Sequence, residues 1–209
     1  MKLYVYGASG HGREIAQLAK RCGYAVSAFI DDNSSLWSTH INDIPVVSAS
    51  DALDYHDTQQ FIVAIGNPEA RRTIMERLQR YGFKFATLIH PNVDLDDHVT
   101  VGEGSMICAG CSIKVNASIG RGVILNSLST VGHDSILEDY VSVMPGVNIS
   151  GGVHVCTGAY IGTNAAIRNG VPDKMLIVGA HAVVGMGAIV VKAVGDNTTV
   201  VGNPAKERT

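Results

Sequence analysis

An aliphatic residue recurs every six positions through the middle of this chain, and that strict period constrains the fold more than any other feature. The run extends without a gap from residue 95 to residue 167. Its members are Leu95, Val101, Ile107, Ile113, Ile119, Leu125, Val131, Leu137, Val143, Ile149, Val155, Ile161 and Ile167. An amphipathic helix has a period of about 3.6 residues and cannot keep a six-residue register. The segment is therefore predicted to be non-helical.

A second series stands four residues after the aliphatic positions and contains only small or β-branched residues. It consists of Ser105, Cys111, Ala117, Val123, Ser129, Ser135, Val141, Val147, Val153, Ala159, Ala165 and Val171. A solenoid with short strands as flat sides explains both series, because the large residue then points to the axis and the small one fills a corner. Glycines beside the aliphatic position are expected where the chain turns tightly. They are Gly102, Gly120, Gly132 and Gly162.

The six-residue register breaks at Asp173. Residues 172–176 are therefore predicted to form a protruding loop. The inward aliphatic positions are expected to resume at Ile177, Val183 and Ile189.

Residues 1 to about 88 alternate strand-like and helix-like segments instead. Strands are predicted at residues 3–6, 25–30, 46–47, 61–65 and 83–89. One helix is predicted before Gly23, with the apolar stripe Ile15, Leu18, Ala19 and Cys22. A short second helix is predicted to begin near Ser50. A third is predicted after the cap Asn67-Pro68, with the stripe Ile74, Leu78 and Tyr81. Such alternation favours a small parallel sheet with crossover helices.

Composition excludes several classes of protein. Among 209 residues, 16 Lys and Arg face 19 Asp and Glu with no basic cluster, which argues against a nucleic-acid partner. The most apolar stretch, residues 177–191, has 15 residues, and about 20 are needed to cross a bilayer. Four cysteines are too few to make a disulfide-stabilised scaffold of a chain this long. We expect a soluble, cytoplasmic protein with reduced thiols and no membrane insertion.

A glycine-rich turn at residues 7–12 follows the first predicted strand and opens a helix, which is where a phosphate-binding turn belongs. Its spacing is GxxGxG, and a tight structural turn is the alternative. Asp31 and Asp32 end the next strand, where an acid commonly meets a ribose hydroxyl. A dinucleotide needs two such halves, and about 88 residues supply only one. A single nucleotide diphosphate is therefore the better fit.

Several motifs together resemble one family. They are the hexads, YGASGHG at residues 6–12, the pair Asp31-Asp32, AIGN at 64–67, NSLSTVGHD at 126–134 and VGNPAK at 201–206. These resemble the hexapeptide-repeat nucleotide-sugar acetyltransferases of bacterial surface-glycan pathways. Within this group they resemble the bacillosamine-type UDP-4-amino-sugar N-acetyltransferases and the sialic acid O-acetyltransferases.

The resemblance implies an α/β fold class for the N-terminal part, a small Rossmann-like parallel sheet, followed by an all-β left-handed parallel β-helix. The period itself does not show the hand. Residues 1–88 would be the nucleotide-sugar-binding domain, 89–194 the acyltransferase domain, and 195–209 a tail near CoA. The family forms homotrimers with the cofactor between neighbouring solenoids, and exposed sheet faces and coil ends favour oligomerisation independently.

His133 is the catalytic candidate. It occupies the third position of its hexad and should point away from the axis, where a histidine is ordinarily a solvated surface residue. The resemblance instead makes His133 the general base, a task that the ordinary pKa of histidine, about 6.5, permits near neutrality. Asp134 would support it, but adjacent side chains on a flat strand point to opposite faces. The pair therefore requires a corner.

The resemblance also implies substrate and cofactor contacts. The nucleotide sugar would contact Ser9, Gly10, His11, Asp31, Asp32 and Gly66, and Asn126 would orient the acceptor. Acetyl-CoA would be the co-substrate, with the N–H of Gly151 as oxyanion donor and with Thr163, Gly185 and Met186 lining its site. Ser142 occupies the place of a second histidine that the family often carries to hold the cofactor, so this contact departs from the pattern.

No metal is expected. Cys108 and Cys111 form only half of a zinc motif, and Cys111 falls on an inward corner, which favours core packing. His154 and His181 have no partners at ligand spacing.

The preferred hypothesis is an acetyl-CoA-dependent N-acetyltransferase that acts on a nucleotide-linked amino sugar, a UDP-4-amino sugar above all, in surface-glycan synthesis. One alternative keeps the fold and cofactor but acetylates a hydroxyl, as on sialic acid. Another is a non-catalytic trimeric scaffold that binds a nucleotide sugar.

Overall fold

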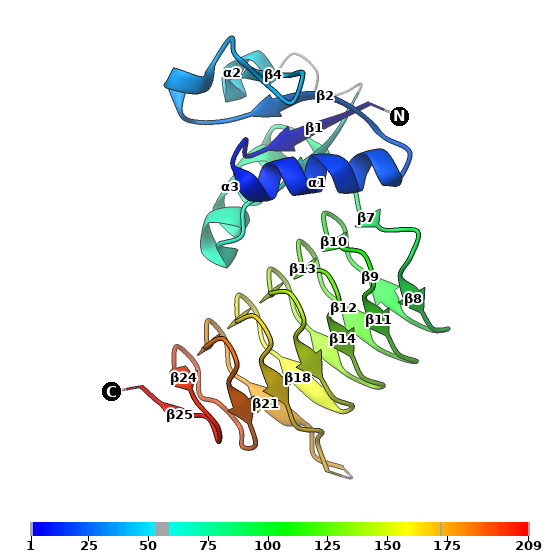
Figure 1. The fold of residues 1–209 in the computed structure, drawn as a ribbon, viewed down its shortest axis with the longest axis vertical. Helices are drawn as coiled ribbons and strands as arrows, with labels where there is room; N and C mark the ends of the chain where they lie inside the picture. Colours follow the sequence, from blue (N-terminus) through cyan, green and yellow to red (C-terminus); the bar gives the residue numbers. More distant parts are fainter. Residues whose placement is uncertain (1, 53–58, 172, 209) are drawn as a thin grey trace.

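The computed structural model describes residues 2–52, 59–171 and 173–208. An α/β unit lies at one end of a long β-helix (Figure 1). The elements of the α/β unit are β1 (Lys2–Tyr6), α1 (Gly10–Arg21), β2 (Ala25–Ile30), the 3-10 turn η1 (Ser34–Leu36), β3 (His40–Ile41), β4 (Ile44–Val47), α2 (Ala49–Ala52), β5 (Gln60–Val63), α3 (Pro68–Arg80) and β6 (Lys84–Phe85).

The sheet of the α/β unit has the strand order β3-β4-β2-β1-β5-β6 and is parallel except for β3. Alternate residues of β1 enter different cores. Leu3 and Val5 pack with α1, whereas Tyr4 and Tyr6 pack with α2 and α3. The chain leaves β1 on one side for β2 and β4 and returns on the other side as β5. The carboxyl ends of β1 and β5 therefore border the crevice where open α/β sheets bind ligands.

The predicted α/β pattern is largely confirmed, with three differences. The segment at residues 83–89 is two strands, because β6 joins the α/β sheet while β7 joins the β-helix. The antiparallel β3 was not predicted. Tyr81 does not continue the buried stripe of α3, since the helix ends at Arg80 and Tyr81 is 57% exposed. As expected, Asn67 caps α3 by accepting the Ala70 N–H at 2.9 Å, and Gly23 has a positive φ after α1.

The β-helix is a stack of coils with three flat faces (Figure 1). The first face contains β7 (Leu88–Ile89), β10 (Met106–Ile107), β13 (Ile124–Leu125), β16 (Ser142–Val143), β19 (Tyr160–Ile161), β22 (Val183–Val184), β24 (Thr199–Val201) and β25 (Lys206–Glu207). The second contains β8 (Asp94–Leu95), β11 (Ser112–Ile113), β14 (Thr130–Val131), β17 (Asn148–Ile149), β20 (Ala166–Ile167) and β23 (Ile189–Val190). The third contains β9 (Thr100–Val101), β12 (Ser118–Ile119), β15 (Ile136–Leu137), β18 (Val153–Val155) and β21 (Leu176–Val178).

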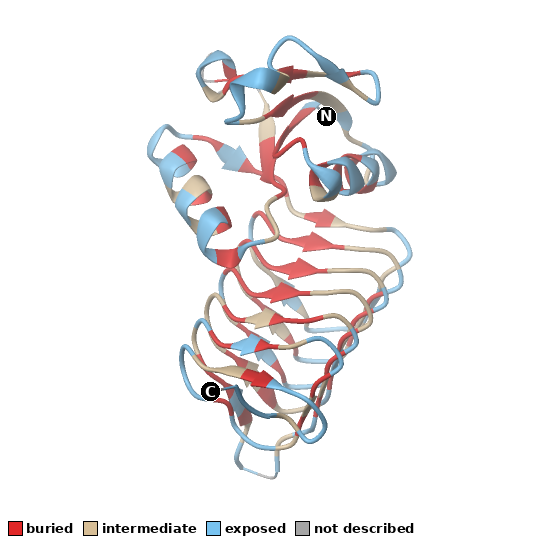
Figure 2. Ribbon diagram, turned by 60° about the vertical axis from the view of Figure 1, so that its left-hand side comes forward, coloured by how far each residue is buried: buried red, intermediate tan, exposed pale blue. Residues whose placement is uncertain are grey.

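Three hexads complete one coil, so stacked residues are 18 positions apart, as in the parallel pairing of Ile107 with Leu125 and of Leu125 with Val143. The fold is the left-handed parallel β-helix that was expected. Buried residues recur along the strands of the coils, and many residues of the turns between them are exposed (Figure 2). The corner serines also bind the next coil: the Ser135 hydroxyl, for example, donates to Ser150 O and accepts from Val153 N.

The predicted register is wrong after the break. Val155 pairs with Val178, so five residues are inserted into this coil, and the inward positions become Val178, Val184 and Val190. Ile177 and Val183, predicted to point inward, are each 37% exposed, and Ile189 is only half-buried. The insertion does form a loop, in which Val171 bridges to Lys174. Val171 is exposed rather than a corner residue, and Leu176 replaces it over Val153. Pro172 lies outside the described residues.

The tight turns lie two residues later than expected. Positive φ angles occur at the third residue after the inward aliphatic residue, as at Asn116, Leu128 and Asp134. The glycine directly after the aliphatic residue serves close stacking instead. A Cβ on Gly132, for example, would lie 2.3 Å from the backbone nitrogen of Gly151 in the next coil.

A buried arginine joins the two parts of the chain. Arg71 of α3 has no exposed surface and no carboxylate partner among the described residues. Its guanidinium donates instead to the carbonyls of Ile65, Gly122 and Tyr140, each at 2.7 Å. Burial lowers the pKa of Arg71 to about 9, so the group is still charged at neutral pH. The contact fixes the β5–α3 turn against the β-helix.

Among the described residues, no helix is long and apolar enough to span a membrane. The four cysteines are free thiols, and Cys111 is buried in the core of the β-helix as predicted.

Candidate active site

His133 and Asp134 lie together at the corner between the second and third faces, which we call the second corner. Asp134 adopts φ +57°, and this left-handed turn brings two adjacent side chains to the same side of the chain. His133 Nδ1 lies 2.7 Å from Asp134 Oδ2. The corner that the sequence required is therefore present. With Nδ1–H donated to the carboxylate, the tautomer leaves Nε2 free to accept a proton.

Asn116 holds the carboxylate from the coil before, and sequence reasoning missed it. Its Nδ2 donates to Asp134 Oδ1 at 3.0 Å. The hydrogen bonds from His133 and, second, from Asn116 lower the pKa of Asp134, so the carboxyl is ionised near neutral pH. A signal was available, because Asn116 stands 18 positions before Asp134, which is the length of one coil.

The backbone N–H of Gly151 lies beside the imidazole and has no acceptor among the described residues. At comparable corners a side chain 19 positions earlier caps this N–H: Asp96 caps Val115, and Glu138 caps Thr157. For Gly151 that position is Gly132, which has no side chain. A Cβ at Gly151 itself would lie 2.4 Å from His133 Nε2. The two glycines thus leave one basic nitrogen and one open N–H side by side.

These groups line a cleft of about 520 Å³ that reaches from His133 to the inserted loop at Lys174 and Met175. A second cavity of about 280 Å³ continues from that loop along the same corner. Its exposed cations Arg168, Lys174 and Lys192 have no carboxylate partner among the described residues. The cleft therefore has the Asp134 carboxylate beside the histidine, Asp173 in the inserted loop, and three cations toward its far end.

The other predicted cofactor and acceptor residues lie elsewhere on the same chain. Asn126, Thr163, Gly185 and Met186 stand at the corner between the first and second faces, which we call the first corner. The width of the second face separates this corner from His133. Met186 and Leu128, at the first corner, are 80% and 70% exposed. One chain alone does not bring the two groups together.

Ser142 does not fit a direct cofactor contact, and the expectation is corrected. It is fully buried on the first face, under the α/β unit. Its hydroxyl donates to Gly66 O and accepts from Arg71 Nη2, both at 2.9 Å. The chain thus uses this position to join the turn after β5 to the β-helix.

The glycine-rich turn connects β1 to α1 at the crevice of the sheet. Gly12 is required there because a Cβ would lie 1.9 Å from Gly7 O. Ser9 is the N-cap residue of α1, but its side chain makes no capping bond, so the helix begins with open N–H groups. Such a terminus favours an anion. Ser9, Gly10 and His11 therefore stand where a phosphate could bind.

The two acids after β2 have different tasks. Asp31 accepts the N–H groups of Ala8 and Asn33, both at 2.9 Å, and so holds the glycine-rich turn itself. Asp32 accepts the Tyr6 hydroxyl at 2.6 Å and lies near Arg77, and its side chain is 61% exposed. Of the two, only Asp32 keeps an oxygen free for a ligand.

His11 is partly buried and has one nitrogen without a partner among the described residues. Its Nε2 is buried and has no hydrogen-bond partner among the described residues. Burial lowers the pKa of His11 despite the opposing effect of the nearby Glu14 carboxylate, so the ring is neutral near pH 7. A buried nitrogen without a partner is costly, which indicates a ligand at this point.

Comparisons with known proteins agree with this architecture. Residues 2–78 match the family described as the PglD N-terminal domain. The chain is 38% identical to GDP-perosamine N-acetyltransferase of Escherichia coli O157:H7, over 99% of this chain and 96% of the relative. It is 32% identical to UDP-N-acetylbacillosamine N-acetyltransferase of Bacillus subtilis (strain 168), over half of each chain.

Two solved structures have the same fold over nearly the whole length. The acetyltransferase domain of PglB from Neisseria gonorrhoeae FA1090, in complex with acetyl coenzyme A, is 34% identical with a TM-score of 0.90, covering 99% of this chain and 98% of that one. PerB from Caulobacter crescentus, in complex with CoA and GDP-perosamine, is 27% identical with a TM-score of 0.91, covering 100% and 98%.

An N-terminal Rossmann-like α/β sheet followed by a left-handed parallel β-helix is the architecture of the hexapeptide-repeat acyltransferases. Identity of 38% over almost the entire chain narrows that class. The chain belongs to the nucleotide-sugar N-acetyltransferases, and it is an enzyme of acetyl transfer.

Proposed function

We propose that this enzyme transfers the acetyl group of acetyl-CoA to the amine of a GDP-linked amino sugar of the perosamine type, with His133 as the general base. The observation that carries the proposal is the arrangement at the second corner: His133 Nε2 free, Nδ1 held by Asp134 at 2.7 Å, and the open N–H of Gly151 beside it. A base and an oxyanion donor at one point are what acyl transfer requires.

The sequence led us to expect a UDP sugar. We choose a GDP sugar instead because of how much of this chain aligns with each of the two named relatives. The relative named for GDP-perosamine aligns over 99% of this chain, whereas the relative named for a UDP sugar aligns over 50%. In the α/β unit, the open start of α1 would bind the diphosphate, the free oxygen of Asp32 a ribose hydroxyl, and His11 Nε2 a polar group of the ligand. A role in surface-glycan synthesis follows if the sugar is destined for a polysaccharide.

In the reaction, the neutral amine attacks the thioester carbonyl while His133 Nε2 accepts a proton from the nitrogen. The negative charge on the carbonyl oxygen is stabilised by the Gly151 N–H. Collapse of the tetrahedral intermediate breaks the carbon–sulfur bond, and the imidazolium returns the proton to the CoA thiolate. Asp134 keeps the ring oriented and stabilises its cationic form, because its carboxyl remains ionised.

Acetyl-CoA would lie along the second corner with its thioester at His133. Three coil steps separate His133 from Lys192, at about 4.8 Å each, which suits an extended pantetheine arm. The phosphates would then meet Arg168, Lys174 and Lys192 at the positive end of the cleft. These cations add to the cofactor contacts expected at Thr163, Gly185 and Met186.

A homotrimer would complete the site. The expected contacts divide between the first corner, with Asn126, Thr163 and Met186, and the second corner, with His133 and Gly151. If the second faces of three subunits turn toward one axis, the first corner of one subunit meets the second corner of the next. The exposed Leu128 and Met186 would then be covered.

The test is acetyl transfer from acetyl-CoA to a panel of acceptors: GDP-perosamine, a UDP-4-amino sugar and sialic acid. We expect GDP-perosamine to have the highest kcat/KM. Preference for the UDP sugar would overturn the choice of nucleotide, and preference for sialic acid would favour O-acetylation. Binding of a nucleotide sugar with no transfer to any acceptor would favour the non-catalytic scaffold.

A further inference from the structure

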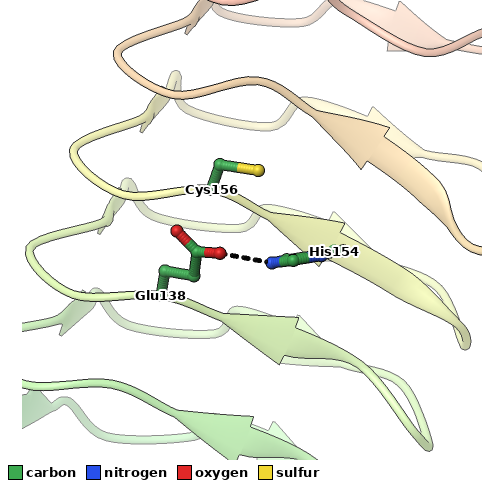
Figure 3. A group of neighbouring side chains, drawn as sticks. All are labelled: Glu138, His154 and Cys156. Carbon is green, nitrogen blue, oxygen red and sulfur yellow. Dashed lines mark hydrogen bonds and ion pairs between the residues drawn. The ribbon is translucent and has the colours of Figure 1, made fainter.

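Three metal-ligating side chains converge at the corner between the third and first faces, away from His133. Glu138 follows β15, His154 lies within β18, and Cys156 follows β18 (Figure 3). His154 Nε2 is 2.7 Å from Glu138 Oε1. One ligand atom from each of the three residues lies within 4.8 Å of the others. Among the described residues this is the only such group of three.

The coil period brings them together, and for this reason the sequence did not reveal them. Glu138 and Cys156 each follow an inward aliphatic residue, Leu137 or Val155, and these two residues pair on neighbouring strands. His154 in β18 and Cys156 directly after it are two positions apart, so their side chains lie on the same side of the chain. His154 and Cys156 stand 16 and 18 positions after Glu138, which matches no common zinc motif. In this fold, however, residues about 18 positions apart are neighbours on adjacent coils.

We propose that Glu138, His154 and Cys156 bind a thiophilic divalent transition metal of the zinc class, with the fourth coordination position open to water. Imidazole nitrogen, thiolate sulfur and carboxylate oxygen form a zinc donor set, whereas calcium and magnesium do not use sulfur. The expectation of no metal rested on sequence spacing alone.

Holding the ion requires the three ligand atoms, which lie within 4.8 Å of one another, to adjust to tetrahedral spacing. Metal–ligand bonds of about 2.0–2.3 Å in a tetrahedron place ligand atoms about 3.3–3.6 Å apart. The 2.7 Å contact between His154 and Glu138 must therefore open by about 0.6 Å, as the ion replaces the proton they share. Meanwhile Glu138 Oε2 accepts the Thr157 N–H at 2.8 Å. Such an outer hydrogen bond orients a ligating carboxylate.

The site is accessible and is supplied by two coils. The His154 and Glu138 side chains are 26% and 39% exposed, which leaves a path for the ion and for a water ligand. Burial raises the pKa of Cys156, and the charge of Glu138 adds to this, so metal binding must release the thiol proton. Because Glu138 comes from one coil and the other two ligands from the next, the bound ion would cross-link two adjacent coils. Binding to the folded state alone would raise Tm.

Cobalt is the probe, because a thiolate ligand gives a charge-transfer band and tetrahedral coordination gives intense visible bands. The full-length protein, without a polyhistidine tag and stripped with a chelator, is titrated with Co²⁺ and then with Zn²⁺. We expect one cobalt per chain, a thiolate band, displacement by zinc, and a rise in Tm with zinc. Cys156→Ala should abolish the band, and Glu138→Gln should weaken binding by at least about tenfold.

Cys108→Ala is the matched control and should keep the spectrum, and His154→Gln is a second ligand variant in case Cys156→Ala does not fold. Absence of stoichiometric cobalt binding, or a thiolate band that survives Cys156→Ala, would overturn the proposal. Acetyl transfer is measured separately, since the metal site and the His133 site lie at different corners and either assignment can fail alone.

Discussion

The imidazole of His133 lies directly against Gly151, so closely that a Cβ at residue 151 would be 2.4 Å from Nε2. Gly151→Ala should therefore push the ring out of position while leaving the N–H in place. We expect kcat/KM to fall by about 100-fold or more, the size of a general-base contribution, with Tm nearly unchanged. Gly195→Ala, whose Cβ would meet only the Thr198 hydroxyl at 3.2 Å, is the control. Full activity of Gly151→Ala would show that the ring need not occupy this position.

Asn116 should act through Asp134 rather than on the substrate. Because its hydrogen bond helps to lower the pKa of Asp134, Asn116→Ala should raise that pKa toward the ordinary Asp value. In the native protein the carboxylate remains ionised until the pH falls through the lowered pKa, and the variant should lose the charge at higher pH. At pH 7 the carboxyl stays ionised in both proteins, so the loss there comes from poorer positioning of Asp134: we expect activity to fall about 2- to 10-fold, the usual net effect of one hydrogen bond. NMR titration of Asp134 tests the shift, and an unchanged midpoint would contradict it.

Arg71 should hold the α/β unit on the β-helix. Arg71→Ala would leave the carbonyls of Ile65, Gly122 and Tyr140 buried without a donor. We expect a loss of about 3 kcal/mol or more in the free energy of unfolding, measured by urea denaturation. Arg80→Ala, exposed on the same helix, should change it by less than about 0.5 kcal/mol. Equal effects of the two substitutions would refute the role of Arg71.

A site shared between subunits should allow two inactive variants to rescue each other. His133→Ala removes the base at the second corner, and Asn126→Ala alters the first corner. In mixed trimers from co-expression in equal amounts, about one quarter of the interfaces would carry both native residues. We expect about that fraction of native activity. No recovery above the separate variants would place the whole site within one chain.

The period of six was sufficient to predict the β-helix, because each aliphatic residue up to Ile167 marks one face. It failed beyond the insertion for a specific reason. The aliphatic residues there come in pairs, Ile177-Val178 and Val183-Val184, so two registers fit equally well, and only the pairing of Val155 with Val178 decides between them.

The parts of the site that escaped prediction depend on contacts between coils or between the two parts of the chain. Asn116 reaches Asp134, and Glu138 reaches His154, only because one coil has 18 residues. Ser142 was expected at the cofactor, yet it accepts a hydrogen bond from Arg71 of α3. No local sequence pattern shows that this distant helix packs against the β-helix. The contact between His133 and Asp134 could be predicted because the two residues are adjacent in the sequence.

The most direct test of the mechanism is the rate of acetyl transfer to GDP-perosamine by His133→Ala, together with its affinity for acetyl-CoA measured by calorimetry. We expect kcat to fall by about 10²–10⁴-fold, as for loss of a general base, with acetyl-CoA affinity and Tm close to those of the native enzyme. Activity within a few-fold of native would contradict the assignment of His133 as the base.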